Sequence, residues 1–206
     1  MSILNVQTKD TAPEASKPFL DQAEKAYGFI PNLTAVFANS PAMIEAYGVL
    51  SSHFEKTDLT PTERQIVLMT NNRLNGCTYC MAAHSTISQM QKVPADVVTA
   101  LRDGTEIADP KLQALQVFTA RINETRGYVD QADINAFLAA GYTEANILDV
   151  ILGTGLKTLS NYTNHISGTP LDAPFQPNAW EPSDAQSAVN AQEAARASGE
   201  ASANWA

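Results

Sequence analysis

Apolar residues recur at three- and four-residue spacing through most of this 206-residue chain. No convincing two-residue alternation bounded by turn residues interrupts that pattern. A spacing of this kind places the apolar residues on one face of a helix, whereas strands need a period of two. The sequence therefore predicts an all-α fold. The expected helices, about eight, cover residues 14–27, 41–55, 61–75, 77–91, 95–102, 110–124, 131–139 and 144–166.

Several of these helices have recognisable start and stop residues. Thr60 precedes Pro61 and Glu63, which together offer an N-cap, a first-turn proline and the carboxylate of a capping box. Asn75-Gly76 provides a C-terminal stop. Ser40-Pro41 and Val93-Pro94 mark two further helix starts.

The composition changes near residue 170. Prolines 170, 174, 177 and 182 occur in a segment that is unlike a helix, and an alanine-rich polar stretch follows to the C-terminus. We therefore expect one helical domain over 1–169 and an arm or disordered tail over 170–206. In an ordered arm, Trp180 or Trp205 is expected to dock onto a neighbouring subunit.

The charge and the apolar runs exclude several classes of protein. A net charge of −9 argues against binding to nucleic acid and to anionic membranes, which are recognised largely through clusters of Lys and Arg. No apolar run approaches the roughly 18–20 residues that span a bilayer. The first ten residues lack the basic and apolar regions of a secretory signal, so we expect a cytoplasmic, reducing location.

Two cysteines, the only ones in the chain, lie in the segment from Gly76 to His84. Cys77, Cys80 and His84 have the spacing i, i+3 and i+7, which brings both sulfurs and the imidazole onto one helical face. Because Asn75-Gly76 ends the preceding helix, the cysteines are expected in a first turn, where free N–H groups and the helix dipole stabilise a thiolate. In a reducing compartment this pattern favours a redox or metal role over a structural disulfide.

The position of His84 indicates which of the two cysteines attacks the substrate. His84, one turn beyond Cys80, can accept its proton or, once protonated, hold the thiolate by charge, so Cys80 is the better nucleophile. A thiolate that attacks a peroxide becomes a sulfenic acid, which Cys77 can resolve to a disulfide. The same pair could also exchange with a substrate dithiol or disulfide, and either reaction needs an external reductant.

Two polar residues of the preceding helix could approach the dithiol. Glu63 and Gln65 are about 200° apart around a helix, so only one can face the site. Glu63 already has a structural explanation in the capping box.

Other interpretations of the cysteines remain open. Structural zinc would need His53 or His165 beside His84, without the spacing of familiar zinc fingers. His53-Phe54-Glu55 before a CxxC is similar to a zinc deaminase pattern, but Gly76 stands where that pattern has proline. Both cysteines could also be small buried apolar residues, and His165 is better explained as a hydrogen-bonded structural group.

A weak internal similarity occurs at an offset of 81 residues. Thr62, Glu63, Ile66 and His84 recur as Thr143, Glu144, Ile147 and His165. If it reflects a repeat, the chain contains two related helical hairpins, and the second has lost the sulfurs.

The segment from Thr60 to His84, with Asn-Gly-Cys-x-Tyr-Cys-x-x-x-His at its end, resembles the AhpD-like alkylhydroperoxidase branch of the carboxymuconolactone decarboxylase family. Further similarity covers Gly28–Leu33, Asn39–Pro41 and Leu159–His165, so it extends over most of residues 13–170. The alanine-rich tail lies outside it.

The resemblance implies an all-helical subunit that assembles into trimers or hexamers, with Cys80 as the peroxidatic thiol, Cys77 as its partner and His84 in a proton relay. By motif position the relay carboxylate of this family falls on Gln65, and a histidine found between the cysteines in some members is Tyr79. An amide such as that of Gln65 cannot relay a proton as a carboxylate does. Either Glu63 has taken over the relay, or water does this work, or the peroxidase reaction is slow.

The expected function is therefore a thiol-dependent peroxidase or disulfide oxidoreductase that reduces hydroperoxides with an external dithiol, without a cofactor or metal. The alternatives are a decarboxylase-like lyase, in which a histidine carries acid–base chemistry, and a redox sensor without turnover.

Overall fold

The structure is a computed structural model that describes residues 4–182. Within that range it contains nine α-helices, two short 3₁₀-helices and no strand, which confirms the all-α prediction. The α-helices are α1 (Lys17–Tyr27), α2 (Asn32–Phe37), α3 (Pro41–Phe54), α4 (Pro61–Leu74), α5 (Thr78–Met90), α6 (Ala95–Asp103), α7 (Pro110–Thr125), α8 (Gln131–Ala139) and α9 (Glu144–Ser167). The 3₁₀-helices are η1 (Glu14–Ser16) and η2 (Ala173–Asn178).

All eight helices expected from the sequence are present, with small differences at their ends. The capping box predicted at Thr60 and Glu63 is formed, and Thr143 and Asn146 form a second one at the start of α9. The sequence did not reveal α2, because its six residues are too short to show a helical period.

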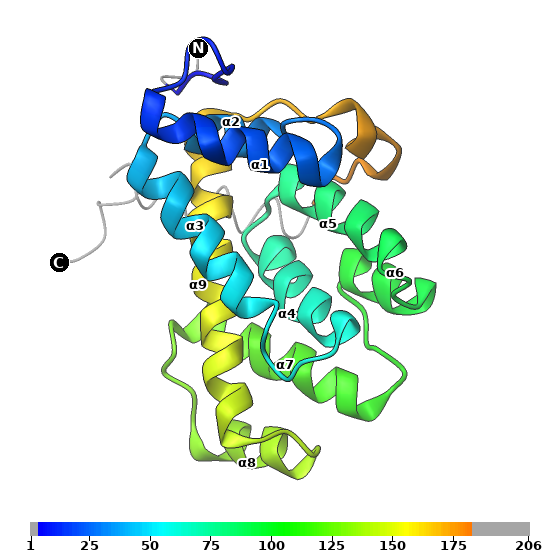
Figure 1. Cartoon of the computed structure of the whole chain (residues 1–206). Helices are drawn as coiled ribbons and strands as arrows, with labels where there is room; N and C mark the ends of the chain where they lie inside the picture. The colour runs from blue at the N-terminus through cyan, green and yellow to red at the C-terminus, as the bar shows by residue number, and fades with distance from the viewer. Residues whose placement is uncertain (1–3, 183–206) are drawn as a thin grey trace, which may run out of the picture.

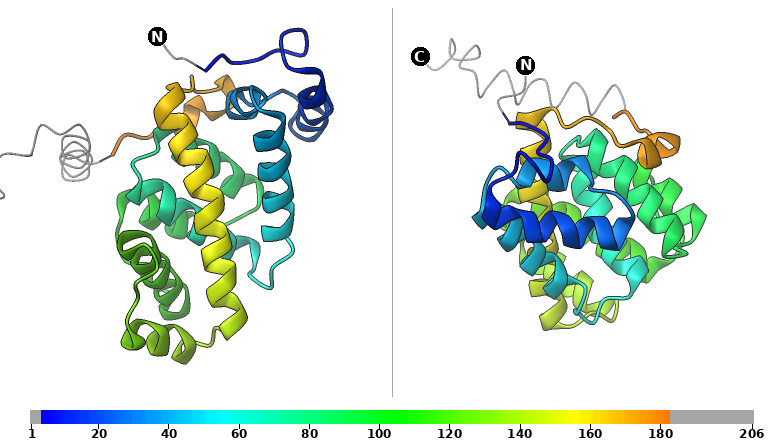
Figure 2. Two further views of the ribbon diagram at one scale, coloured as in Figure 1. Left: turned by 90° about the vertical axis from the view of Figure 1, so that its left-hand side faces the viewer. Right: turned by 45° about the horizontal axis from the view of Figure 1, so that its top comes forward.

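The long helix α9 organises the molecule. It runs from α8 at one end to a layer made by α1 and α2 at the other end, with α3 and α4 packed along it (Figures 1 and 2). The helix α4 is central, because it also contacts α5, α6 and α7. The site residues on α4, α5 and α9 therefore come from the three helices that meet near the α1–α2 end.

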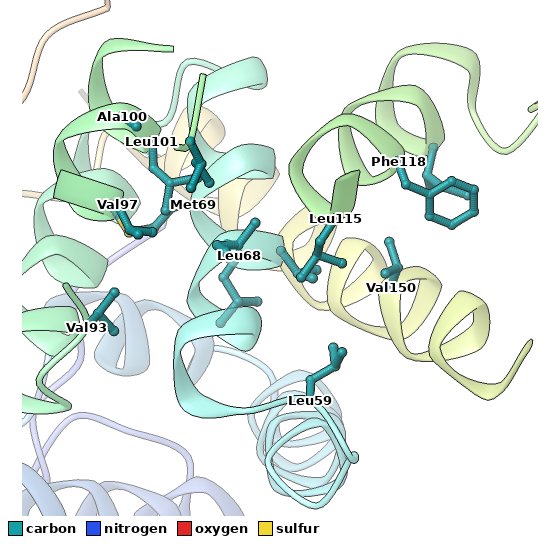
Figure 3. Close-up of a cluster of buried hydrophobic side chains, with 14 of the residues drawn as sticks. Leu59, Leu68, Met69, Val93, Val97, Ala100, Leu101, Leu115, Phe118 and Val150 are labelled. Atoms are coloured by element: carbon teal, nitrogen blue, oxygen red, sulfur yellow. The ribbon is translucent and has the colours of Figure 1, made fainter. Parts of the chain in front are cut away.

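The buried apolar residues form two clusters. The larger one fills the space between α4, α6, α7, α8 and α9, and Figure 3 shows part of it around Leu68 and Leu115. Phe137 stacks between Phe118 and Tyr142, which ties α8 to this cluster. The smaller cluster lies between α1, α2 and α5 and includes both cysteines. The dithiol is thus embedded in an apolar region of its own.

The structure contradicts the repeat suggested by the sequence. The helices α4 and α5 are separated at Gly76, whose φ of 64° lies in the left-handed region that favours glycine. The corresponding residues of the second half form α9, which is one uninterrupted helix. The second helical hairpin, which the sequence predicts only if the similarity reflects a repeat, is therefore not formed by residues 143–165.

The segment 170–182, which the sequence places in the C-terminal arm, packs against the helical domain. Its 3₁₀-helix η2 contacts α5 (Figure 2). Phe175 of this segment is buried in the smaller cluster. Trp180 Nε1 donates a hydrogen bond to the carbonyl of Arg102 over 3.0 Å, so this tryptophan docks onto its own chain. The rest of the predicted arm, with Trp205, lies outside the described residues.

In the part of the chain that the structure describes, no helix combines the length and the apolar character that crossing a membrane requires.

Gly153 allows α9 to approach α3 and α4 closely. A Cβ atom at this position would lie 2.6 Å from Val67 Cγ1 and 2.8 Å from the ring of Phe54, and both of those side chains are buried. Gly155, on the same helix, has open space around the equivalent position.

We therefore expect Gly153→Ala to lower the free energy of unfolding by up to about 2 kcal/mol, because overpacking costs about 1–3 kcal/mol and the helix propensity of alanine returns about 1 kcal/mol. Gly155→Ala is the matched control, and it should raise that free energy by up to about 1 kcal/mol. Urea unfolding of both variants measures the difference. Equal effects at the two positions would contradict the close approach.

Candidate active site

Cys77 and Cys80 lie at the start of α5, as the sequence predicted. Cys77 is the N-cap, and its Sγ accepts a hydrogen bond from the backbone N–H of Cys80 over 3.4 Å. Both are free thiols, and each is only 1% exposed. The first-turn N–H groups and the positive end of the helix dipole therefore face the sulfurs.

The helix α9 contributes a polar face to the dithiol. Lys157, Ser160, Asn161 and Asn164 are all buried on it, with the spacing i, i+3, i+4 and i+7. The side-chain N–H₂ of Asn164 donates to Cys80 Sγ at 3.1 Å and lies 3.6 Å from Cys77 Sγ. The side chains of Ser160 and Asn161 also act on Cys80, and both lower its pKa. Hydrogen bonds of this kind stabilise a thiolate.

A row of polar side chains continues from Lys157 to the surface. Lys157 Nζ lies 3.1 Å from His84 Nε2, and His84 Nδ1 lies 2.9 Å from Gln65 Oε1. Gln65 Nε2 in turn donates to Gln91 Oε1 over 3.1 Å, and Gln91 is exposed. Because a protonated lysine can only donate, His84 Nε2 is the acceptor, and the imidazole proton is on Nδ1, where it is donated to Gln65.

The two thiols differ in acidity. Burial opposes ionisation of Cys80, but the hydrogen bond from Cys77, the charge of Lys157 and the hydrogen bonds from Ser160 and Asn161 together lower its pKa. The pKa of Cys77 is raised, first by its hydrogen bond to Cys80 and then by burial. The directions of the two shifts make Cys80 the more acidic thiol of the pair.

The positive charge beside this thiolate belongs to Lys157. Burial and then the neighbouring lysine charge lower the pKa of His84 well below its usual value, so its imidazole is neutral. Lys157 is 1% exposed, and burial opposes its charge, but Cys80 and then Tyr47 raise its pKa. A charged histidine that holds the thiolate, one of the two roles considered for His84, does not agree with this arrangement.

Of the two candidates on α4, the structure brings Gln65 to the site and not Glu63. Glu63 accepts the backbone N–H of Thr60 over 2.8 Å and lies 3.2 Å from Lys111 Nζ. Its hydrogen bonds and its ion pair join it to Thr60 and Lys111, whereas Gln65 contacts His84. Glu63 therefore completes the capping box.

Sequence reasoning missed Lys157 and Asn164. One signal was present, because Lys157 is the only charged residue between Asp149 and His165 in a helix of apolar and small residues. A lone charge at that position indicates burial against a partner. The partner could not be identified, because Lys157 lies 73 positions from His84 in the sequence, and only packing brings α9 to α5.

The segment after α9 is fastened over the dithiol by Tyr79. Its hydroxyl donates to Asp172 Oδ2 over 2.6 Å and accepts the backbone N–H of Leu33 over 3.2 Å. The N–H of Asn32 donates to both oxygens of the same carboxylate. This clasp joins α5, α2 and the segment 170–182, and it contributes to the burial of the two sulfurs.

His165, considered above as a structural group, is on the exposed side of α9 with its ring near that of Tyr162. Between residues 4 and 182 no group of three or more His, Cys, Asp or Glu side chains is placed to hold a metal ion. The described residues therefore offer no set of ligands for the zinc sites considered above.

Solved structures similar to this one share its architecture. A protein from Ralstonia eutropha JMP134, described as an alkylhydroperoxidase AhpD core and an uncharacterized peroxidase-related protein, superposes with a TM-score of 0.75 at 22% identity, over 84% of this chain and 94% of that one. The chain has the AhpD-like fold. This confirms the fold expected from the resemblance, since at such identity the comparison informs about the fold alone.

Two further matches belong to the same group of folds. A peroxidase-related protein from Silicibacter sp. TM1040 has a TM-score of 0.74 at 17% identity, over 84% of this chain and 93% of that one. The debrominase Bmp8, solved in complex with 2,3,4-tribromopyrrole, has a TM-score of 0.72 at 16% identity, over 86% of this chain and 96% of that one. No protein-family model and no curated protein sequence matches the chain.

The acidity of the two thiols can be tested by thiolate absorbance. In the reduced protein we expect one thiolate that persists below the usual cysteine pKa and is lost as the pH falls through the lowered pKa of Cys80. Cys80→Ala should remove it. Cys77→Ala should keep it but raise its pKa, because the hydrogen bond from Cys77 is gone. A low-pKa thiolate that survives in Cys80→Ala would reverse the assignment.

The clasp can be tested with Tyr79→Phe. Loss of a hydrogen bond to a buried carboxylate costs about 1.5–3 kcal/mol, so the segment 170–182 should open more often and expose the sulfurs. We expect faster alkylation of the thiols by a neutral reagent under native conditions. Tyr128→Phe is the matched control, because Tyr128 is 89% exposed, and it should leave the alkylation rate unchanged.

Proposed function

We propose that this AhpD-like protein is a thiol-dependent peroxidase that reduces hydroperoxides through Cys80 and Cys77. The observation that carries the proposal is the difference between the two thiols. Cys80 is buried, its sulfur accepts a hydrogen bond from Asn164, and the positive charge of Lys157 stabilises its thiolate. A stabilised thiolate beside a protonated thiol is the arrangement that oxidation followed by disulfide formation requires.

The reaction has three steps. The Cys80 thiolate attacks the terminal oxygen of the hydroperoxide, so that an S–O bond forms, the O–O bond breaks and the remaining oxygen leaves as an alcohol after it gains a proton. Cys77 then attacks the Cys80 sulfenic acid, an S–S bond forms and water leaves. An external dithiol returns two electrons and two protons by thiol–disulfide exchange.

The surroundings of the sulfurs favour an organic hydroperoxide. The dithiol belongs to an apolar cluster in which Phe29, Phe37 and Phe175 are prominent, and its polar contacts come from α9. An apolar substituent would gain free energy on leaving water for such surroundings, whereas hydrogen peroxide would not.

We also propose that the protein works as a homo-oligomer in the cytoplasm. Leu148, Ile151 and Ile166 are 67%, 47% and 64% exposed on the outer face of α9. A row of exposed apolar side chains along one helix is more typical of a subunit interface than of a monomer surface. The trimer or hexamer implied by the resemblance is the expected assembly.

The function is tested by following the decay of cumene hydroperoxide with dithiothreitol as reductant. Wild type should turn over repeatedly. Cys80→Ser should lose the reaction, because no thiolate attacks. Cys77→Ser should stop after one equivalent and leave a sulfenic acid on Cys80 that dimedone traps.

Three outcomes would contradict the peroxidase. Wild-type activity in both variants would favour the decarboxylase-like lyase, in which the cysteines are dispensable. Oxidation of the wild type without turnover would favour a redox sensor. Reaction with disulfide substrates in place of hydroperoxides would make the protein a disulfide oxidoreductase.

A further inference from the structure

We propose that Lys157 is a catalytic acid–base group of the dithiol, which gives its proton to the oxygen that leaves the hydroperoxide and takes the proton of Cys77 before the disulfide forms. This inference rests on the proposed peroxidase function. It assigns the proton chemistry to a residue of α9 and leaves His84, on α5, as the group that positions it.

The position of Lys157 is the first argument. Its ammonium lies 3.1 Å from His84 Nε2, in a site where it is 1% exposed, and it interacts electrostatically with Cys80. A lysine is rarely buried without a partner, because its charge loses most of its hydration. Here the electrostatic partner is Cys80, whose sulfur attacks the hydroperoxide. Lys157 is therefore near the peroxide oxygens as the O–O bond breaks.

The state of His84 is the second argument. Its Nδ1 proton is donated to the neutral amide of Gln65, and its Nε2 accepts from Lys157, so the imidazole offers no proton toward the sulfur. With a glutamine as acceptor, no negative charge favours an imidazolium, and the adjacent ammonium disfavours one. The glutamine at position 65 and the buried lysine are therefore complementary: together they keep His84 neutral and place the only cation of the row on Lys157.

The proton steps balance. As the Cys80 thiolate forms the S–O bond, the electron pair of the O–O bond moves to the departing oxygen, which takes a proton from the Lys157 ammonium and leaves as an alcohol. The neutral amine then accepts the proton of the Cys77 thiol. The Cys77 thiolate forms the S–S bond and displaces hydroxide from Cys80, and the hydroxide takes the proton back from Lys157 and leaves as water.

This sequence couples the charge of Lys157 to the redox state. In the reduced protein the ammonium faces a thiolate, and the pair is neutral overall. After the disulfide forms, no anion remains at the sulfurs, and a buried amine without a counter-charge favours its neutral form. Reduction by an external dithiol therefore restores a proton to Cys77 and another to Lys157.

The first test compares Lys157→Met with wild type in a single turnover. The fully reduced proteins react with cumene hydroperoxide at several pH values, and thiolate absorbance gives the ionised fraction of Cys80 at each. In Lys157→Met we expect the thiolate fraction at neutral pH to fall by about tenfold or more, since the positive charge is lost. We also expect the rate per thiolate to fall by about a hundredfold, because the departing oxygen has lost its proton donor.

Controls separate these effects from a loss of structure. Lys25→Met makes the same chemical change on the exposed side of α1 and should match wild type in both measurements. Lys157→Gln, which keeps a polar group in the site, should show the same two losses as Lys157→Met. Circular dichroism and thermal unfolding identify any variant that does not fold.

A second test needs only the wild type and holds even if both variants fail to fold. The protons taken up on reduction of the disulfide are counted with a pH indicator in weakly buffered solution near neutral pH, after correction for the reductant. We expect two protons per disulfide, one for Cys77 and one for Lys157. A count of one would mean that Lys157 keeps the same charge in both redox states, and would overturn the inference.

The outcomes distinguish this inference from the function on which it rests. If wild type turns over hydroperoxide and Lys157→Met reacts as fast per thiolate, Lys157 is not the acid and the peroxidase stands. If wild type shows no turnover but the proton count is two and the thiolate fraction falls in Lys157→Met, the peroxidase falls. Lys157 then remains the acid–base group of a dithiol that exchanges with disulfides.

Discussion

The buried pair formed by the Lys157 ammonium and the Cys80 thiolate is the interaction on which the site depends. Either charge alone would be costly at this depth, because the interior cannot replace the hydration that each ion loses. Together they form a neutral pair, and the hydrogen bonds from Asn164 and to His84 satisfy further polar atoms. The pair also joins α9 to α5, so the chemistry of the site and the packing of its helices share one contact.

The rest of the architecture holds these two groups together. Gly153 allows α9 to lie close to α3 and α4, and Gly76 breaks the chain between α4 and α5 so that Cys77 can cap a new helix. The clasp of Tyr79 and Asp172 covers the sulfurs with the segment that follows α9. Both cysteines are buried in the resulting structure, and a site of low polarity strengthens both the ion pair and its hydrogen bonds.

Local sequence signals predicted most of the fold and the part of the candidate site that belongs to α5. Eight helices were predictable because caps, prolines and apolar spacing act within one or two turns, and the position of both cysteines follows from the stop at Gly76. The same logic failed for α2, which is too short for a period, and for the hairpin repeat, because similar spacing also occurs in one straight helix. The choice between Glu63 and Gln65 stayed open in the sequence, because it depends on how α4 is rotated about its axis against α5, and the structure places Gln65 beside His84.

The sequence by itself determined that this protein is helical and that its two thiols lie at a helix start, because helix propensity, capping and the spacing of Cys77, Cys80 and His84 are local properties. Only the tertiary structure decided which group carries the positive charge beside the thiolate. That choice depends on which side chain of a distant helix is buried against the sulfur, and on the neutral partner that His84 meets. The packing of α9 against α4 and α5 sets both, and it gives the charge to Lys157.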